Sequence, residues 1–431
     1  MLLEFSVSNF RSFKDEQTLS LLAGRDKKHP GNLIQMGPYR TLKCAVLYGA
    51  NASGKSNLIR AIDVMIDFVR VSATKMTEGD KIPGVVPFRL SAQAGPQPSR
   101  FGVKLLVGDI VYNYAFSANQ SRVFEECLSA GPIGGSEKLW FSRAFDEAAQ
   151  DYKWEFGAHL REGESVLRER TRGNGLALSR GAEQNMKPLS DLFIALSKRT
   201  WVFQLSDPLI GLPQQTARRM LGSQPFAERI VRLVRDADLS IEGLTVEERP
   251  ADSEVLALIH KIMPESLLKS MGDKDFSAPA IRTAHRVRDT DAAVEFNMED
   301  ESNGTQRFFA LAGPVVDALE KGALLVVDEL DCSMHPLLTR KLLELFQSES
   351  WNPKGAQLIF TTHDTSLMQP ALFRRDQVWL VEKDASGASR LRSLYDYRKP
   401  RSTESFQRNY LAGRYGALPS FGPTFEDLET P

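Results

Sequence analysis

The chain has 431 residues and an ordinary composition for a soluble protein, with 42% hydrophobic and 25% charged residues. A formal net charge of −1 excludes the overall basic field of many nucleic-acid-binding proteins. No apolar run approaches the roughly 20 residues of a membrane-spanning helix, and the N-terminus lacks the basic start of a signal peptide. We therefore expect a cytoplasmic protein with no membrane partner.

The strongest motif lies near the N-terminus, after a first predicted strand in MLLEFSVSNF. The segment LYGANASGKSN fits the pattern GxxxxGK[ST], follows the apolar stretch LKCAVL and precedes a helical period in residues 56–72. In such a loop, backbone N–H groups and the helix N-terminus bind phosphates, the lysine reaches the outer phosphates and the serine holds Mg²⁺. The predicted phosphate-binding residues are Gly49, Asn51, Ala52, Ser53, Gly54, Lys55, Ser56 and Asn57.

The middle of the chain changes from a strand pattern to a helical pattern. Residues 100–160 alternate and turn like hairpins, whereas residues near 183–270 read as helical, with a break at Gly222 and Pro225. Because no heptad repeat is present in the sequence, we expect a globular insertion and not a coiled coil. The basic stretch RERTRGNG (168–175) is interpreted as a solvated loop, with a contact to nucleic acid or an acidic partner left open.

A small polar turn, within ESNGTQRFFAL, precedes the next helical period. Ser302, Asn303, Gly304 and Thr305 resemble the Ser-Gly-Gly signature turn of ABC-type ATPases, although Asn303 replaces a glycine and Glu301 replaces a leucine. Small side chains would let the serine hydroxyl and backbone N–H groups of one subunit contact a γ-phosphate held by another subunit. The alternative interpretation is a polar turn ahead of a helix.

A second apolar strand, GALLVVDELD, ends in two acidic residues. Asp328 is a candidate for holding Mg²⁺ together with Ser56. Glu329 is a candidate for orienting and deprotonating the attacking water. A solvated strand end that carries adjacent carboxylates is an equal alternative when this stretch is taken alone.

Two further stretches follow this strand. CSMHP occupies the D-loop position, with Ser333 and His335 as candidate contacts across a dimer. QLIFTTHDTSLM predicts an apolar strand that ends at His363, the switch-histidine position, where an imidazole would contact the γ-phosphate. The remaining stretch is too short for an appended Toprim-type nuclease domain, so we expect any nuclease on a separate chain. Its Arg- and Tyr-rich part, residues 390–415, suits a protein interface, a nucleic-acid contact or packing on its own head.

More than half of the chain separates Lys55 from Asp328. This spacing resembles that of ABC-type ATPases of the SMC/RecF class, whose nucleotide-binding head is assembled from both ends of the chain. The whole chain resembles bacterial stand-alone ABC-type ATPases, known as AAA family ATPases or RloA-like proteins and associated with anti-phage defence. The stretches that carry this resemblance are LLEFSVSNFRSFKDEQTLSLLA, VPFRL, ESNGTQRFFAL, VVDELDCSMHP, TTHDTSL, LFRRDQVWLVEKD and YLAGRYGALP.

The resemblance implies an α/β P-loop NTPase with an ABC-type head, in which helices flank a mixed β-sheet. Residues 1–90 and 291–431 would form the head, and residues 91–290 would form a globular insertion that is β-rich and then helical. In NFRSF, the resemblance makes Arg11 and Ser12 candidate nucleotide ligands, while an arginine that only caps a strand edge is an equal alternative.

The resemblance also implies the function. ATP, with Mg²⁺, would join two heads into a dimer or a higher oligomer and so control a separate effector, such as a Toprim-like or RloB-like nuclease. The leading alternative is a DNA-repair-like clamp that acts directly on nucleic acid, and nucleic acid or a phage component is left open as a ligand. A transporter subunit is disfavoured by the large insertion, and a scaffold without ATP turnover is disfavoured by Glu329 and His363.

Overall fold

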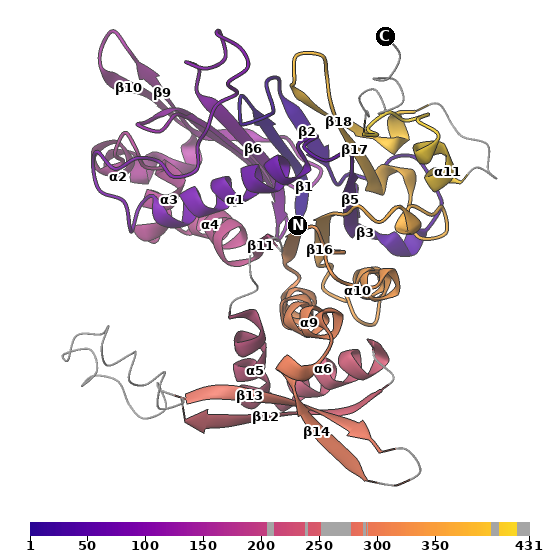
Figure 1. Cartoon of the computed structure of the whole chain (residues 1–431). Helices are drawn as coiled ribbons and strands as arrows, with labels where there is room; N and C mark the ends of the chain where they lie inside the picture. The colour runs from indigo at the N-terminus through magenta and orange to yellow at the C-terminus, as the bar shows by residue number, and fades with distance from the viewer. Residues whose placement is uncertain are drawn as a thin grey trace, which may run out of the picture. The chain divides into compact units, whose positions relative to one another are not determined.

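Figure 1 shows the computed structural model of the chain, which describes residues 1–204, 211–237, 240–250, 277–287, 290, 292–397 and 405–419. The chain divides into two compact units. Unit 1 comprises Met1–Ser206, Ala318–Leu330 and Leu343–Pro431, and unit 2 comprises Asp207–Asp317 and Asp331–Leu342. The predicted boundaries at residues 90 and 290 differ from this division, because unit 1 continues to Ser206.

A six-stranded sheet lies at the centre of unit 1. Its strand order is β11 (Thr200–Gln204), β15 (Leu324–Asp328), β16 (Gln357–Thr361), β5 (Cys44–Tyr48), β17 (Val378–Lys383) and β18 (Ser389–Ser393). The first five strands are parallel, and β18 runs antiparallel to β17. Every residue of β5, β15 and β16 is buried, as expected for parallel strands covered on both faces.

A seven-stranded antiparallel sheet forms the second layer of unit 1. Its order is β10 (Asp151–Phe156), β9 (Lys138–Asp146), β8 (Val123–Pro132), β7 (Ile110–Ala118), β6 (Ser99–Val107), β1 (Leu2–Ser8) and β2 (Gln17–Ser20). The predicted hairpins within residues 100–160 are thereby confirmed. Because β6 pairs directly with β1, this β-rich segment continues the sheet that the N-terminus begins. A small ribbon joins β3 (Leu33–Met36) to β4 (Tyr39–Leu42).

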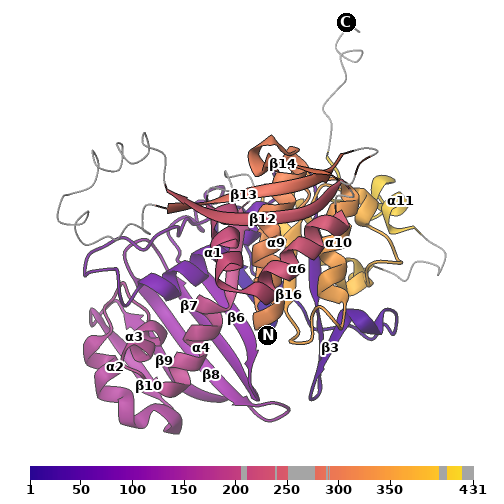
Figure 2. The same ribbon diagram turned by 90° about the horizontal axis from the view of Figure 1, so that it is seen from below.

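Helices of unit 1 cover the inner face of this layer (Figures 1 and 2). They are α1 (Lys55–Val71), α2 (Glu164–Arg170), α3 (Ala177–Glu183) and α4 (Lys187–Lys198). The helix predicted after the glycine-rich loop is confirmed as α1, which contacts α3, α4, β11 and β15. Its apolar side chains at positions 58, 59, 62, 65, 66 and 69 are all buried, so its helical period corresponds to one packed face.

The basic stretch RERTRGNG contains a buried anchor, so the interpretation of the whole stretch as a solvated loop is wrong. Asn174 is only 5% exposed, and its Nδ2 donates to the carbonyls of Thr77 (2.8 Å) and Asp80 (3.0 Å). Beside it, Arg143 forms a fully buried ion pair with Glu126 (2.8 Å) and also donates to backbone carbonyls of the loop. The sheet therefore holds this loop through side chains that require charge partners. The arginines of α2 stay exposed.

Unit 2 contains helices and a three-stranded antiparallel sheet. The sheet order is β12 (Ile241–Pro250), β13 (Ser277–Arg286) and β14 (Ala293–Asn297). The helices are α5 (Leu212–Gly222), α6 (Gln224–Ala237), α9 (Asn303–Lys321), which continues into unit 1, and α10 (Pro336–Gln347), which does the same. The expected helix break is confirmed, because α5 ends before Ser223 and α6 begins after it.

The expectation of a helical segment near 183–270 is only partly correct. The structure places strands β11 and β12 inside it, and residues 205–210, 238–239 and 251–276 lie outside the described part of the chain. Strand β12 was missed because its polar, charged sequence IEGLTVEERP has little apolar alternation. Pairing with β13 over its full length, a long-range contact, defines it as a strand.

The C-terminal stretch packs on its own unit. Helix α11 (Phe406–Leu411) buries Tyr410, whose ring lies 6.0 Å from that of Tyr48, and Gln407 N–H donates to the Met368 carbonyl at 3.1 Å. Tyr397 donates to the carbonyl of Tyr415. Of the three alternatives left open for residues 390–415, the described part therefore supports packing on the head, while residues 398–404 lie outside it.

Short 3₁₀ turns complete the chain: η1 (Pro30–Asn32), η2 (Ala158–Gly163), η4 (Met298–Asp300), η5 (Thr365–Leu367), η6 (Arg375–Gln377) and η7 (Leu394–Asp396). The predicted fold class, an α/β P-loop NTPase with a mixed sheet and flanking helices, is confirmed by the strand–loop–helix unit β5–α1 within this sheet. None of the helices in the described part of the chain is long and apolar enough to cross a lipid bilayer.

Candidate functional site

Four parallel strands of unit 1 bring three motif segments and the end of β11 to one edge of the sheet. The order β11–β15–β16–β5 is parallel throughout, so all four strands end on the same side. The register pairs Leu47 with Thr361 and Gln204 with Asp328. The glycine-rich loop after β5, His363 after β16 and the acidic pair at the end of β15 therefore share this edge, which we call the nucleotide edge.

The glycine-rich loop has the backbone shape of a phosphate cradle. Ala52 and Gly54 have φ values of 62° and 117°, and Gly54 is the residue from which α1 begins. Lys55 is 6% exposed, and its Nζ donates to the carbonyls of Gly49 (2.8 Å) and Ala50 (3.1 Å). These contacts place the lysine ammonium over the loop that phosphates would enter.

The remaining predicted loop residues differ in burial. Gly49 and Ser53 are buried, Asn51 and Ala52 are exposed, and Ser56 and Asn57 are half-buried. The Ser53 hydroxyl is buried and has no hydrogen-bond partner in the described part of the chain. A buried hydroxyl in this position is suited to a phosphate oxygen, because an unsatisfied polar group is otherwise costly.

Ser12 supports this loop from a neighbouring segment. Its Oγ accepts a hydrogen bond from Nδ2 of Asn57 at 2.8 Å, and its carbonyl accepts one from Ser389 N–H at 2.7 Å. Ser389 in turn donates from Oγ to the carbonyl of Ser53 at 2.5 Å. A Cβ on Gly54 would lie 2.8 Å from Ser12 Oγ, so only glycine fits between these serines. The structure thus places Ser12 against the loop as a support, and its role as a nucleotide ligand stays a prediction.

Arg11 lies next to Ser12 in a left-handed backbone conformation, with φ at 48°. Its Nε is buried and has no hydrogen-bond partner among the described residues. Burial first, and then the nearby Arg60 and Arg89, lower the pKa of Arg11. A guanidinium near two like charges is suited to an anionic ligand, and the contact of Arg11 with nucleotide stays a prediction beside the strand-cap alternative.

The acidic pair at the end of β15 is tied to β16 through one hydroxyl. Thr361, which is fully buried, donates from Oγ1 to Oδ1 of Asp328 at 2.6 Å and accepts from the N–H of Glu329 at 2.7 Å. Asp328 is 4% exposed, while Glu329 is half-buried and has a left-handed φ of 56°. The first carboxylate is therefore held inside the edge. The second follows a sharp turn whose backbone conformation is uncommon for glutamate.

His363 lies in the loop after β16, and its side chain is exposed. The loop is braced by neighbours. The hydroxyl of Tyr48 donates to the Asp364 carbonyl at 3.1 Å, and the Asp364 side chain accepts from Ser366 N–H at 2.8 Å. The prediction placed His363 at the strand end, and the structure ends β16 two residues earlier, at Thr361. The histidine is thus presented on a short, fixed loop at the nucleotide edge.

The signature turn lies in unit 2, at the start of α9. Ser302 and Asn303 are exposed, Gly304 is half-buried and Thr305 is 8% exposed. Ser302 Oγ accepts from Thr305 N–H at 3.1 Å, which is the contact of a helix N-cap. Gly304 faces the D-loop, since an added Cβ would lie 3.3 Å from the Ser333 carbonyl. The turn therefore exposes small side chains ahead of a 19-residue helix, as an anion-contacting turn requires.

In the D-loop, Ser333 and His335 are both exposed. Ser333 has a left-handed φ of 56°, and His335 Nδ1 accepts from the N–H of Leu337 at 3.2 Å. Their exposure is consistent with the predicted contacts across a dimer, which stay a prediction.

The residues proposed for Mg²⁺ fit a magnesium ion by chemistry. Asp328 supplies a carboxylate and Ser56 a hydroxyl, and oxygen ligands are those that magnesium prefers. Such an ion typically keeps waters and binds one or two protein groups together with phosphates. No group of three or more His, Cys, Asp or Glu residues that could hold a metal ion occurs in the described part of the chain.

Sequence reasoning missed two residues of this edge. Gln204 ends β11 in register with Asp328, and its amide accepts from Arg60 Nε and donates to Asp63, both at 3.4 Å. An amide oxygen in this position is a further candidate for contact with the ion or the attacking water. Thr361 was also missed. The signal that the sequence offers is that each of the two residues ends an apolar stretch, TWVFQ or QLIFT. Their place beside the acidic strand follows only from the strand order.

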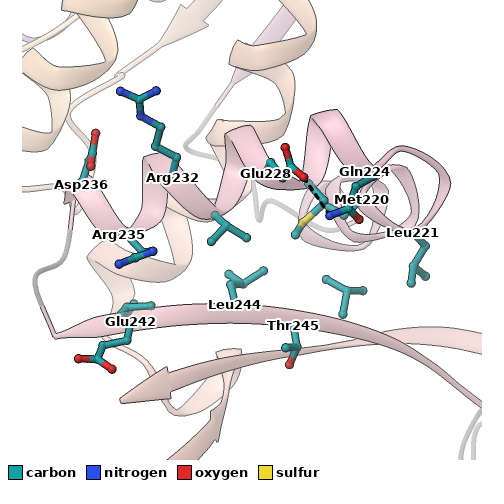
Figure 3. A pocket seen from close by; sticks show the side chains of 14 residues that line it. Met220, Leu221, Gln224, Glu228, Arg232, Arg235, Asp236, Glu242, Leu244 and Thr245 are labelled. Carbon is teal, nitrogen blue, oxygen red and sulfur yellow. Dashed lines mark hydrogen bonds between the residues drawn. The ribbon is translucent and has the colours of Figure 1, made fainter. Parts of the chain in front are cut away.

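A separate groove occurs in unit 2, between α6 and β12, with a volume of about 910 Å³ (Figure 3). Leu244 lies at its centre, and Arg235 and Glu242 line the same end. Its lining mixes apolar side chains with charges of both signs and contains none of the predicted site residues. We therefore do not assign the nucleotide to it.

Comparisons with known proteins cover most of the chain. A family model described as "AAA domain, putative AbiEii toxin, Type IV TA system" matches residues 44–369. No curated protein matches the sequence. Similar solved structures include an SMC head bound to the C-winged helix domain of ScpA, with 13% identity over 91% of this chain and 97% of that chain and a TM-score of 0.40. The SMC head domain from Thermotoga maritima has 14% identity over 91% and 98%, with a TM-score of 0.39. The recombination mediator protein RecF, in its ATPrS form, has 15% identity over 91% and 98%, with a TM-score of 0.30.

Proposed function

Since this chain belongs to the family described as "AAA domain, putative AbiEii toxin, Type IV TA system", we propose that it binds ATP with Mg²⁺ and hydrolyses it. The observation that carries the proposal is the nucleotide edge. There the glycine-rich loop, the acidic pair and His363 follow three neighbouring parallel strands. Binding of phosphate, metal and water at one edge is what hydrolysis of a nucleotide needs.

Each residue of the edge has a defined task in this proposal. The loop N–H groups and Lys55 bind the β- and γ-phosphates, and Ser56 and Asp328 hold the metal ion. Bound Mg²⁺ neutralises phosphate charge. Glu329 orients the attacking water and accepts its proton, and His363 contacts the γ-phosphate from the next loop.

We further propose that two copies of the chain form the complete site. Ser302 and Asn303 are small and exposed, and they stand at the N-terminus of α9, where N–H groups favour an anion. In this arrangement the signature turn of one copy contacts the γ-phosphate bound to the other. ATP then closes the dimer and hydrolysis opens it.

The closing and opening would act as a switch on a separate effector. The family description, "putative AbiEii toxin, Type IV TA system", supports a role in a toxin–antitoxin system, and the resemblance to stand-alone ABC-type ATPases is the ground for proposing anti-phage defence. We propose a nuclease on another chain as the effector. Salt-dependent DNA binding that changes with ATP would instead favour the alternative of a clamp acting directly on nucleic acid.

Two substitutions test the ATPase itself. Lys55→Ala removes the ammonium that lies over the loop and should abolish both ATP binding and hydrolysis. Glu329→Gln should leave binding intact and lower hydrolysis by ~10²–10⁴-fold, because a general base typically contributes that much. Binding is measured with a fluorescent ATP analogue and hydrolysis by phosphate release. Normal affinity in Lys55→Ala, or unchanged turnover in Glu329→Gln, would contradict the assignment.

A mixing experiment tests the action of the signature turn on a partner subunit. Ser302→Arg removes the hydroxyl and adds bulk, whereas Ser302→Ala removes the hydroxyl, with its helix cap (~1 kcal/mol) and its proposed phosphate contact, and adds no bulk. The alanine variant is therefore the matched control for the added bulk. Ser302→Arg should bind ATP normally and fail to hydrolyse it. Mixing it with Lys55→Ala chains should restore part of the activity, since one site of the mixed dimer then has an intact lysine and an intact signature. Mixed dimers without rescue would refute the action in trans.

A further inference from the structure

Glu301, the residue directly before the signature turn, has a specific set of partners in unit 2. Its side chain is only 10% exposed. Its Oε1 accepts hydrogen bonds from the hydroxyl of Thr283 and from Nε2 of His285, the latter at 2.7 Å. Thr283 and His285 are two residues apart on β13, so their side chains point to the same face of the sheet. We call these three residues the Glu301 cluster.

The same stretch of backbone is held from its other side. Gln306, on the first turn of α9, donates from Nε2 to the carbonyl of Glu301 at 2.8 Å and to that of Glu299 at 3.1 Å. Ser302 caps the helix through Thr305. The path of the backbone from Glu301 to Gly304 is therefore determined by a side-chain anchor on β13 at one end and by the helix cap at the other.

A carboxylate is a costly choice for this position if packing is its only task. Its burial requires partners for the charge, whereas an apolar side chain would fill the same space without that cost. A hydrogen-bonded carboxylate, however, fixes the orientation of the Glu301 side chain as well as its contacts. This is because hydrogen bonds from the Thr283 hydroxyl and the His285 ring form only over a narrow range of distances and angles.

The Glu301 cluster also connects the turn to the outer strand of the sheet. The ring of His285 packs edge-on against Phe296 of β14, with centroids 5.1 Å apart. All five residues of β14 are exposed, and Phe296 is 45% exposed. The position of the signature turn is therefore linked through two side chains to a strand that solvent reaches.

We propose that Glu301, held by Thr283 and His285, is a positioning residue for hydrolysis. It orients the exposed hydroxyl and N–H groups of the signature turn toward the γ-phosphate of the partner subunit. This inference rests on the proposed function of the turn. It assigns a role to the glutamate that replaces the leucine of the ABC-type signature pattern.

The test compares variants that remove or keep the acceptor oxygen. Glu301→Leu removes it and should lower kcat at least ~10-fold, because small misplacements of a catalytic group are costly. The KM for ATP and the affinity for a fluorescent ATP analogue should stay within about twofold of wild type, because the loop that binds the nucleotide lies in unit 1. Glu301→Gln keeps an acceptor for Thr283 and should retain most of the activity.

Thr283→Val and Thr283→Ser form a second, milder pair. The valine variant loses only the hydroxyl that donates to Glu301 and should show a smaller fall in kcat, whereas the serine variant keeps the hydroxyl and should resemble wild type. This pair also decides the question if Glu301→Leu fails to fold. Mixing Glu301→Leu with Lys55→Ala chains should restore part of the activity, since the misplaced turn serves the partner's site.

Three results would overturn the inference. The first is an unchanged kcat in Glu301→Leu and Thr283→Val, and the second is a loss of nucleotide affinity that matches the loss of kcat. The third is that Lys55→Ala chains restore activity when mixed with Ser302→Arg chains but not when mixed with Glu301→Leu chains. Lys55→Ala and Glu329→Gln are measured in parallel. If those two variants hydrolyse ATP like wild type, the proposed function fails. If they are inactive and only the Glu301 and Thr283 variants resemble wild type, the inference about Glu301 fails alone.

Discussion

The nucleotide edge of unit 1 and the signature turn of unit 2 are held in place by different means. At the nucleotide edge, the pairing of four parallel strands determines where each loop begins, and one buried threonine, Thr361, joins the two acidic residues. At the signature turn, the backbone depends on the side chains of the Glu301 cluster and on a helix cap.

This difference has a consequence for regulation. Strand pairing is shared among many backbone hydrogen bonds, so a change outside the edge has little influence on it. An anchor of a few side chains is easier to displace by a single substitution. We therefore expect the nucleotide edge to supply constant chemistry and the signature turn to supply the adjustable step.

Of the three sites compared next, Gly54 should show the largest effect: Gly54→Ala tests whether backbone shape, in addition to strand pairing, forms the edge. The new Cβ would meet Ser12 and Ser389, and alanine is strained at a φ of 117°. We expect nucleotide affinity to fall at least ~100-fold and stability to fall by ~1–3 kcal/mol. Nucleotide titration and thermal melting measure the two quantities.

Gly31→Ala is the control for that experiment, because an added Cβ there has open space within 4 Å. It should bind and melt like wild type. A Gly54→Ala protein that binds nucleotide normally would show that strand pairing alone suffices to form the site.

A smaller effect is expected from Thr361→Val, which removes the hydroxyl that links Asp328 and Glu329 at the nucleotide edge. The substitution leaves Asp328 without a donor and the Glu329 N–H without an acceptor, so kcat should fall ~10–100-fold and stability by ~1–3 kcal/mol. Thr361→Ser keeps the hydroxyl and should retain most of the activity. Equal activity in the two variants would mean that strand pairing by itself holds the acidic pair.

The smallest effect is a pH dependence that arises beside the nucleotide edge. Burial, and then repulsion by Asp67, raise the pKa of Asp63 from 3.8 to about 6. The folded protein thus binds this proton more tightly than the unfolded chain. The contribution of protonated Asp63 to the stability of the fold is complete below about pH 4 and is lost as the pH rises through about 6.

Asp63→Asn should remove that pH dependence and should be neutral or stabilising above about pH 6. The difference in the free energy of unfolding between wild type and Asp63→Asn should stay below about 2 kcal/mol, because solvent screens this partly exposed carboxylate. Thermal melting of both proteins between about pH 4 and 7.5 measures it. Parallel curves for wild type and Asp63→Asn would show that Asp63 titrates normally.

Much of the nucleotide edge could be predicted from the sequence, because its parts are local patterns. A glycine-rich loop between an apolar strand and an amphipathic helix predicts β5 and α1, and apolar runs that end in polar residues predict β15 and β16. The predicted roles of the motif residues follow from residue type and spacing, and they stay predictions until the variants are measured.

The tertiary structure alone decided which residues become neighbours. Gln204 and Thr361 have no motif, and their place at the edge follows only from strand order and register. Asn174 lies in a basic, glycine-containing stretch whose composition suggests solvent, yet it is buried by contacts with residues nearly a hundred positions away. The partners of Glu301 come from a strand pair that the sequence did not reveal as such. Periodicity reports which face of a segment is apolar, but it carries no information on which distant segment will cover that face, and hydrogen-bond partners depend on that second fact.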